Sequence, residues 1–494
     1  MLNGFEVKTA AVTAEAYSGA AGIGLLLCKE CAAALGKLQL PDLVHQAVEA
    51  YAARHEDMFE VGTVSKLVLF YDGQLLSVIV AGCGAGSECK PVNFRKAAGE
   101  LARAMQSEKV TKAVLAAPIL TNPKRGAYLE SIVEGLILGS YRFDEFKSDA
   151  KPVMECQLNL LSAVPEVEDL LHKATISAAA VCYTRDLVNR PGNVVNPRVM
   201  AEAAQKLAAV LPLEVEVLDE VQMAQRGMNA LLAVGQGSAN PPRLITLKYQ
   251  GAGNAPFVAY VGKGITFDSG GISIKPDTGM GEMKDDMSGA GAVLGAMQAI
   301  SALGLKCNVY GILACAENMP GGRAQRPGDI VRAANGKTIE VISTDAEGRM
   351  VLADAVDYAC KLGATKIIDI ATLTGAVIIA LGKETSGIIS NDDALVEQIK
   401  KAGKFAGENF WQLPSLPECK EAIKSEVADL LNSAGRPGGC ITGGLFIGEF
   451  VQEGIPWAHL DIGGTSTAEK TKGHKVQGGT GFGTLTLIKL AEQL

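Results

Sequence analysis

The chain has 494 residues, of which 48% are hydrophobic and 20% are charged, so two globular domains are expected from its length. Its formal net charge of −8 argues against a general binder of the nucleic acid backbone, and nucleic acid is not an expected partner. No apolar run approaches the ~20 residues of a membrane span, which argues against a membrane protein.

The first 160 residues alternate short β-like runs with helical stretches, which predicts a small α/β domain. The N-terminus lacks the basic start and long apolar segment of a secretory signal, so a cytoplasmic location is expected. The expected elements, in chain order, are a hairpin of strands 67–70 and 76–80 around Asp72-Gly73, a helix over 94–105 and a buried strand over 112–117. None of these elements carries an obvious catalytic pattern.

The eleven cysteines are scattered, and we interpret them as free buried thiols of a reducing compartment rather than as disulfides. Cys28 and Cys31 form a CxxC pair, but no second pair follows at the spacing of a zinc site. A structural role is therefore favoured over a redox or metal role. The five histidines include no HExxH pattern, so a metal site in this chain must depend on carboxylates.

A long helical pattern over 170–188 follows an acidic joint and ends at a breaker cluster over 189–193. We therefore expect an N-terminal α/β domain over residues 1–165 and a larger α/β domain over 166–494. Strands and helices alternate after that helix, which predicts a mostly parallel central sheet covered by helices, with ligands beyond the carboxyl ends of its strands. The expected strands are 213–218, 243–249, 257–261, 307–313, 338–342, 366–370 and 457–461.

A glycine-rich stretch over 261–276 follows one of these strands and contains Lys263, Asp268 and Lys275. Its glycines permit tight backbone conformations near the charged residues. The segment that comes next places Asp285 and Asp286 before a helix rich in small residues. Taken singly, the two acids could cap that helix, and the two lysines could be solvated loop charges.

The most informative stretch is Ser-Thr-Asp-Ala-Glu-Gly-Arg-Met over 343–350, directly after the apolar strand 338–342. Asp345 and Glu347 are two residues apart, so an extended backbone would direct both carboxylates to one side. Acids and an arginine at the end of a buried strand are costly unless a divalent cation, a bound anion or an ion pair compensates them. Arg349 could simply pair with Glu347.

These acid-bearing segments are expected to meet, because each follows a strand that we place in one sheet. Oxygen ligands in this number suit two divalent cations, which can share carboxylates and activate a water between them. The alternative interpretation is an anion- or nucleotide-binding protein that uses the glycine-rich loop around Lys263. In that case Asp268 would repel a phosphate unless a metal intervened.

The same motifs resemble those of the leucyl aminopeptidase family, also called cytosol aminopeptidases, over residues 170–494. The family signature NTDAEGR occurs here with Ser343 in place of its asparagine, and the VGKGITFDSGG and MKxDM segments are intact. The resemblance implies an exopeptidase that acts on peptide substrates and assembles as a homohexamer. It also implies two divalent metal ions per subunit, namely Zn²⁺ and/or Mn²⁺, with Mg²⁺ as a further candidate.

The resemblance further implies a role for each charged residue of these motifs. The implied metal ligands are Lys263, Asp268, Asp286, Asp345 and Glu347. Asp268 and Glu347 would bridge both ions. Lys275 would stabilise the oxyanion of the tetrahedral intermediate. Arg349 would hold a bicarbonate that serves as general base, and the backbone of Leu373 would help to seat that anion.

The residues implied to line the pocket for the substrate side chain are Met283, Thr372 and Gly375. A methionine-lined, largely apolar pocket favours Leu or a similar apolar residue at the cleaved position. The alternative for the same residues is core packing.

Overall fold

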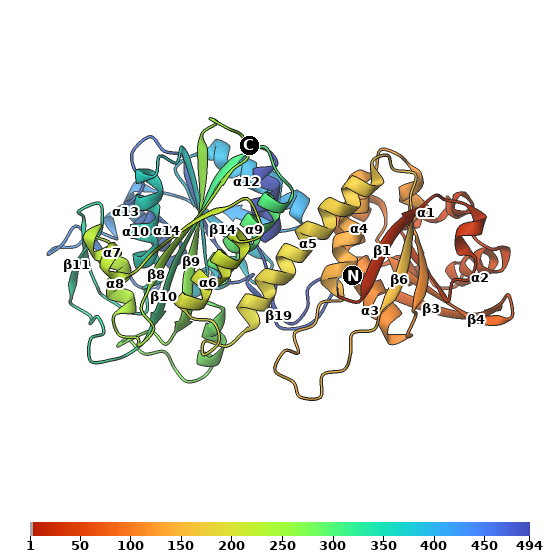
Figure 1. Cartoon of the computed structure of the whole chain (residues 1–494), viewed down its shortest axis with the longest axis horizontal. Helices are drawn as coiled ribbons and strands as arrows, with labels where there is room; N and C mark the ends of the chain where they lie inside the picture. Colours follow the sequence, from red (N-terminus) through yellow and green to blue (C-terminus); the bar gives the residue numbers. More distant parts are fainter. Residues whose placement is uncertain (1–2) are drawn as a thin grey trace. The chain divides into compact units, whose positions relative to one another are not determined.

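The computed structural model describes residues 3–494, which divide into two compact units. The N-terminal unit comprises Met1–Cys182 with the late segment Ala468–Gln477, and the C-terminal unit comprises Tyr183–Thr467 with Gly478–Leu494 (Figure 1). The late segment is anchored within the N-terminal unit, where the Gly473 N–H donates a hydrogen bond to Glu100 Oε1. Among the described residues, no helix has both the length and the hydropathy needed to cross a lipid bilayer.

A six-stranded sheet in the order β1-β6-β5-β2-β4-β3 forms the centre of the N-terminal unit as described. Its strands are β1 (Phe5–Ala10), β2 (Gly22–Leu27), β3 (Val64–Tyr71), β4 (Gln74–Gly82), β5 (Lys112–Ala116) and β6 (Cys156–Leu161). The predicted hairpin is the antiparallel pair β3–β4, and the other pairs are parallel. The predicted helix is α3 (Pro91–Ser107), which packs against β2, β4 and α4 (Gly126–Gly139).

The prediction that all cysteines are free thiols is wrong for one pair. Cys28 and Cys89 form a disulfide across 61 residues of sequence, whereas the other nine cysteines, all in the described part of the chain, take part in no disulfide. Cys28 directly follows β2, and Cys89 lies in the loop after β4. Because β2 and β4 are neighbouring parallel strands, the loops at their carboxyl ends lie side by side. Sequence spacing alone does not reveal this adjacency.

The C-terminal unit is built, within the described residues, on an eight-stranded sheet in the order β15-β14-β17-β13-β9-β10-β8-β7. The strands are β7 (Glu214–Leu218), β8 (Arg243–Gln250), β9 (Phe257–Asp268), β10 (Asn308–Asn318), β13 (Lys366–Ala371), β14 (Thr385–Ser390), β15 (Asn409–Gln412) and β17 (Trp457–Asp461). The four central strands β17, β13, β9 and β10 are parallel. The predicted α/β class, with a mostly parallel sheet in the larger domain, is therefore confirmed, although β14 and β15 were not expected.

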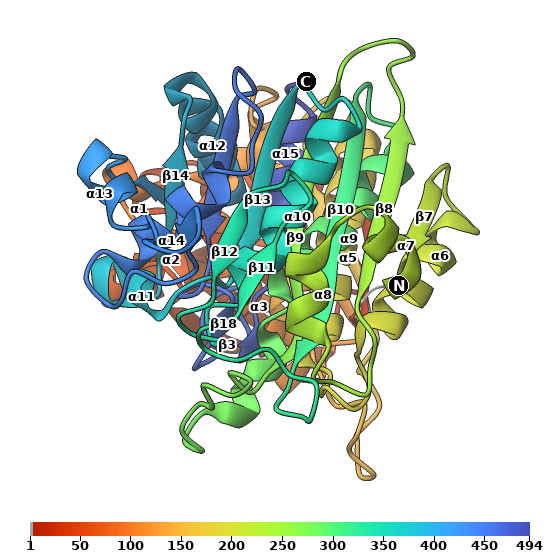
Figure 2. The same cartoon turned by 90° about the vertical axis from the view of Figure 1, so that its left-hand side faces the viewer.

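Helices cover both faces of this sheet (Figure 2). On β9, Val261 packs in a core with helix α10 (Gly348–Lys361), whereas the backbone of Gly262 lies against helix α9 (Ser288–Ala302). Since neighbouring side chains of a strand point to opposite faces, α9 and α10 cover opposite sides. Helix α15 (Thr484–Ala491) packs beside α9, and helices α8 (Asn229–Gly235) and α14 (Gly439–Gly448) pack beside α10.

The strand before residues 343–350 does not belong to the large sheet. β12 (Thr338–Glu340) pairs with β11 (Ile330–Arg332) and β16 (Leu430–Leu431) in a separate three-stranded sheet. The expectation that all acid-bearing segments follow strands of one sheet is therefore wrong. β12 also ends before the acids, so Asp345 lies in a loop and Glu347 is the N-cap residue of α10.

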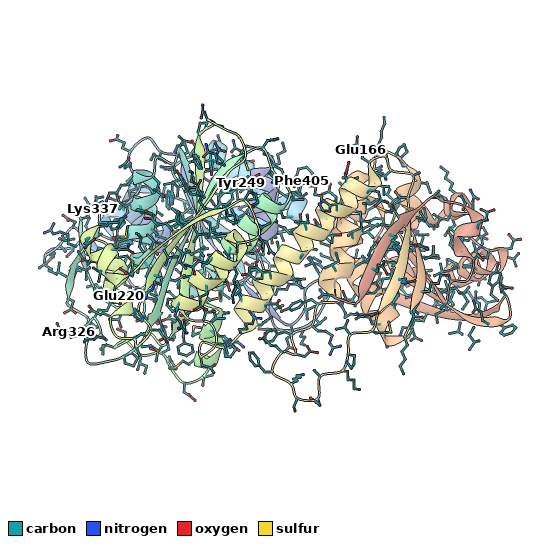
Figure 3. The ribbon with its side chains drawn as sticks, viewed as in Figure 1. Glu166, Glu220, Tyr249, Arg326, Lys337 and Phe405 are labelled. Atoms are coloured by element: carbon teal, nitrogen blue, oxygen red, sulfur yellow. A yellow bond between two sulfur atoms is a disulfide. The ribbon has the colours of Figure 1, made fainter. Side chains whose placement is uncertain are left out.

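Charged side chains such as Glu220 and Arg326 lie at the periphery of the C-terminal unit (Figure 3). Each has a surface partner: Glu220 pairs with Arg243, and Arg326 pairs with Asp329. Such exposed pairs contribute little to stability because water already solvates both charges.

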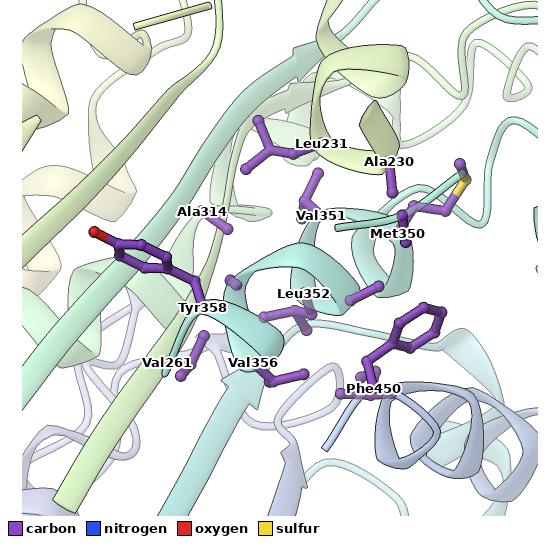
Figure 4. Close-up of a cluster of buried hydrophobic side chains, with 14 of the residues drawn as sticks. Ala230, Leu231, Val261, Ala314, Met350, Val351, Leu352, Val356, Tyr358 and Phe450 are labelled. Atoms are coloured by element: carbon purple, nitrogen blue, oxygen red, sulfur yellow. The ribbon is translucent and has the colours of Figure 1, made fainter. Parts of the chain in front are cut away.

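The core of the C-terminal unit surrounds helix α10, whose Leu352 and Val356 are fully buried (Figure 4). Leu352→Ala is expected to lower the free energy of unfolding by ~2–5 kcal/mol, because it removes packed methyl groups and leaves a cavity. Denaturant titration measures the change. Val210→Ala, at a side chain that is 79% exposed, is the matched control and should stay within ~0.5 kcal/mol of the parent. Equal midpoints for the two variants would contradict the expectation.

Candidate metal centre

Four of the buried charged side chains of the C-terminal unit lie close together, in contrast to the ion pairs at its periphery. Lys263, Asp268, Asp286 and Glu347 are each at most 5% exposed. Burying charges is costly unless they pair with one another or bind an ion. Carboxylate oxygens of the three acids all lie within 4.8 Å of one another. The structure thus brings together acids that are up to 79 residues apart (347 − 268) around one buried point.

Three elements place the residues of this cluster. Lys263 lies within β9 and Asp268 is its last residue, so the strand runs well beyond the predicted end at Val261. Asp286 precedes α9, and Glu347 begins α10. Because the glycines around Lys263 lie inside a strand, they form no loop that leads into a helix N-terminus. The phosphate-binding alternative therefore loses its structural basis.

Lys263 is the positive centre of the cluster. Its Nζ lies 2.9 Å from Asp286 Oδ2 and 2.9 Å from Glu347 Oε1. Gly348 makes this approach possible, because a Cβ atom there would lie 2.6 Å from Lys263 Cε and Nζ. Burial alone would lower the pKa of Lys263, but Asp286, Glu347 and Asp268 raise it well above its ordinary value. Bound cations would oppose protonation and reverse this balance.

Lys275 and Asp345 form the more open side of the cluster. Lys275 Nζ lies 2.8 Å from Asp268 Oδ2 and 2.5 Å from Asp345 Oδ1. The side chains of Lys275 and Asp345 are 20% and 37% exposed, so both reach solvent. Burial would lower the pKa of Lys275, but Asp268 and Glu347 raise it above its ordinary value, so the side chain is an ammonium ion. Lys275 is therefore not a solvated loop charge.

The donor set fits divalent cations. Burial raises the pKa of Asp286 and of Glu347, because it disfavours their charged forms. Added positive charge would stabilise the two carboxylates. Within the described residues, Asp286 Oδ2 accepts no hydrogen bond and is compensated only by the ionic contact with Lys263. Carboxylate oxygens with one lysine nitrogen suit hard or borderline cations. Neither Asp285 nor Asp286 makes a side-chain cap on α9, and burial raises the pKa of Asp285 to about 6.

Arg349 lies in the first turn of α10 and is 8% exposed. Gly443 leaves room for it, because a Cβ atom there would lie 3.1 Å from Arg349 Nη2 and 3.2 Å from Leu373 Cδ2. Among the described residues, Arg349 Nε donates no hydrogen bond, while Glu347 pairs with Lys263 instead. Burial lowers the pKa of Arg349, against the opposing charges of Glu347 and Asp461. A buried guanidinium with a spare N–H fits a small anion.

Two asparagines that sequence reasoning missed hold the acid-bearing loops. Asn318 Nδ2 donates hydrogen bonds to Asp268 Oδ1 at 2.8 Å and to the Thr344 carbonyl at 3.0 Å. Asn432 Nδ2 donates to the Ser343 carbonyl at 2.6 Å. Asn318 ends β10, the neighbour of β9, whereas the strand expected here ended at residue 313, so no signal in the sequence indicated its role.

Hydrogen bonds from the metal-centre cluster and from Asp461 hold the loop after β13, which contains Thr372 and Leu373. Thr372 Oγ1 donates to Asp286 Oδ1 at 2.7 Å, and the Thr372 carbonyl accepts from Lys263 Nζ at 2.9 Å. Asp461, at the end of β17, accepts a hydrogen bond from the Leu373 N–H at 3.2 Å. The backbone of Leu373 was predicted to help seat an anion, and its N–H donates to Asp461 in this structure.

A cavity of about 500 Å³ lies over the cluster. Its lining includes the five predicted metal ligands, Lys275 and the predicted pocket residues Met283, Thr372, Leu373 and Gly375. The pocket residues thus face the cavity rather than a closed core, whereas Arg349 is not part of the lining. A second cavity of about 660 Å³, lined by Lys337, Lys424 and Asp429 among others, shares none of these residues.

A helix-covered parallel sheet with buried carboxylates, a lysine and an adjoining cavity defines a metal-dependent hydrolase. Residues 182–488 match the catalytic domain of the cytosol aminopeptidase family, and residues 9–150 match the N-terminal domain of that family. The chain belongs to the cytosol aminopeptidase family and is a metallo-exopeptidase. The resemblance found in the motifs is confirmed, and it extends to the N-terminal unit.

Known relatives support this assignment over most of the chain. The probable cytosol aminopeptidase of Alkaliphilus metalliredigens is 46% identical over 425 residues, which cover 84% of this chain and 85% of the relative. A mutant of tomato leucine aminopeptidase has a TM-score of 0.87 at 33% identity, covering 99% of this chain and 96% of the tomato chain. The bottromycin maturation enzyme BotP in complex with Mn has a TM-score of 0.85 at 34% identity, covering 96% of this chain and 99% of BotP.

Proposed function

We propose that this protein removes the N-terminal residue, Leu or a similar apolar one, from peptides with the aid of two divalent cations. The observation that carries the proposal is the meeting of Lys263, Asp268, Asp286 and Glu347 beside a cavity. Zn²⁺ and Mn²⁺ are the favoured ions, with Mg²⁺ as a further candidate, and the structure of BotP with Mn supports a divalent metal.

The residues of the cluster divide into ligands and catalytic groups. The proposed ligands are Lys263, Asp268, Asp286, Asp345 and Glu347. When bound, the cations supply Lewis acidity and lower the pKa of a water that they share. Lys275 keeps its ammonium at the cavity, where it polarises the scissile carbonyl and stabilises the developing oxyanion. Arg349 is proposed to hold bicarbonate as general base.

The cavity supports the proposed preference for apolar N-terminal residues. Met283 and Ile378 contribute flexible or branched apolar surface to its lining, and Gly375 leaves space beside them. Thr372 and Thr374 add hydroxyl groups to the same wall. The apolar part of this lining accepts an aliphatic side chain, whereas the hydroxyl groups of Thr372 and Thr374 donate to Asp286 and Asp461. Homohexamer assembly is proposed from the family resemblance, and a cytoplasmic location is proposed from the lack of a secretory signal pattern.

Hydrolysis of a leucyl anilide tests the proposed function. The purified chain is expected to release the anilide, to fall to background after dialysis against a chelator, and to recover with added Mn²⁺. N-acetyl-leucyl anilide is the matched substrate and should stay intact, because an exopeptidase of this class needs a free α-amine. Full activity after exhaustive metal removal would overturn metal dependence, and cleavage of the blocked substrate would overturn recognition of the N-terminus.

A further inference from the structure

Three cysteines of the N-terminal unit form a second cluster of metal-ligating groups, which the proposed catalysis does not use. The sulfur atoms of Cys28, Cys31 and Cys89 all lie within 4.8 Å of one another. Cys28 follows β2, Cys31 lies in the short helix α1 (Lys29–Ala32), and Cys89 follows the 3₁₀ turn after β4. The cluster therefore sits beyond the carboxyl ends of two adjacent parallel strands, where ligands of α/β sheets bind.

Backbone hydrogen bonds hold the two cysteine-bearing loops together independently of the disulfide. The Cys83 N–H donates to the Leu27 carbonyl at 2.8 Å, and the Lys29 N–H donates to the Gly84 carbonyl at 3.1 Å. Reduction of the disulfide breaks neither bond, so the three thiols stay close to one another. The disulfide joins the sulfur atoms of Cys28 and Cys89. The sulfur atom of Cys31 lies beside them and is not part of the disulfide.

A cation lies at the rim of the cluster. Burial raises the pKa of Cys31 and the carboxylate of Glu30 adds to that rise, whereas a backbone hydrogen bond at Cys28 and the guanidinium of Arg125 oppose it. Arg125 stacks over the ring of Tyr128 at 5.3 Å from its centroid, and the Tyr128 hydroxyl donates to the Cys89 carbonyl at 2.9 Å. Three thiolates around a divalent ion carry a net charge of −1, which Arg125 offsets.

We propose that Cys28, Cys31 and Cys89 bind one Zn²⁺ through their thiolates when the protein is reduced. Two equivalents of a low-molecular-weight thiol supply the two electrons and two protons that convert the disulfide into two thiols, and they leave as one molecule of their own disulfide. Ion binding then releases three thiol protons to water. Cys28 and Cys31 have the CxxC spacing of zinc ligands, and Cys31 and Cys89 are only half-buried, so water can take the fourth position.

Cobalt substitution tests this site apart from the catalytic centre. The full chain is reduced with a phosphine, freed of metal and titrated with Co²⁺ as the probe. We expect a near-ultraviolet sulfur-to-cobalt charge-transfer band whose final intensity corresponds to one thiolate-bound ion per chain, reached once the proposed catalytic sites have also been filled, and which is bleached by Zn²⁺. The proposed catalytic ligands are oxygen and nitrogen atoms, so they produce no such band. The result is therefore independent of the proposed peptidase activity.

Single substitutions identify the sulfur atoms involved. Cys31→Ser and Cys89→Ser are expected to lose the band, whereas Cys419→Ser, at a half-buried free thiol of the C-terminal unit, should keep it. Retained hydrolysis of leucyl anilide shows that each variant is folded. Absence of the band in the reduced parent, or an equal band in Cys31→Ser, would overturn the proposal. A reduced chain that re-forms the Cys28–Cys89 disulfide without taking up metal would also overturn it.

Discussion

Lys275→Ala is expected to lower the turnover of a leucyl anilide by about a hundredfold or more while both metals stay bound. The Lys275 ammonium lies at the cavity beside Asp268 and Asp345, where the oxyanion of a tetrahedral intermediate would form. Removal of one such donor typically costs ~3 kcal/mol of transition-state stabilisation. Steady-state kinetics and elemental analysis of the same preparation measure the two quantities.

The matched control for this variant is Lys248→Ala. Lys248 pairs with Glu214 at the surface, and loss of an exposed pair changes stability by ~1 kcal/mol at most. The control should therefore keep the parent turnover. Intact turnover in Lys275→Ala would exclude Lys275 as the oxyanion donor, and loss of metal together with turnover would assign it to ion binding instead.

Glu347→Gln is expected to deplete the bound metal and to lower kcat/KM by at least ~100-fold. Glu347 is 1% exposed, lies 2.9 Å from Lys263 Nζ and shares the buried point with Asp268 and Asp286. An amide has nearly the same shape as the carboxylate but carries no charge and cannot bridge two cations. Mutation of a residue that only hydrogen-bonds to a metal ligand lowers metal affinity or activity by up to ~100-fold. Mutation of a direct ligand should lower them by at least as much.

Metal content per chain and kcat/KM together decide the role of Glu347. Glu449→Gln is the control, because Glu449 pairs with Lys337 outside the cluster and should retain both metal and activity. A Glu347→Gln protein with its full metal content and normal kcat/KM would show that this carboxylate does not bind the ions.

The residues of the candidate site were identifiable from the sequence because they occur in short contiguous motifs. Lys263, Asp268 and Lys275 lie within thirteen positions, and Asp345, Glu347 and Arg349 lie within five (275 − 263 + 1 and 349 − 345 + 1). Such spacing in the sequence does not depend on which sheet the neighbouring strands join. The motifs could therefore be recognised even though the strand before 343–350 was assigned to the wrong sheet.

Features that depend on pairing between distant segments were not predictable in this way. The position of Cys89 beside Cys28 follows from the neighbouring strands β2 and β4, and no local period of the sequence encodes that neighbourhood. Strand β15 is short and lies at the sheet edge, and it buries only one of its four residues, so burial imposes a weak pattern on its sequence. Asn318 and Asp461 support the site from strand ends, and only the order of the strands shows where those ends meet.

The segment Ala468–Gln477 has a consequence for the order in which the protein matures. Its residues complete the N-terminal unit, with Gly473 bonded to Glu100 and its backbone packed against Gly99. Domains usually fold in turn as they leave the ribosome. Here the unit translated first lacks the segment Ala468–Gln477 until the intervening residues Tyr183–Thr467 have been synthesised, so it is completed only after most of the C-terminal unit has been made.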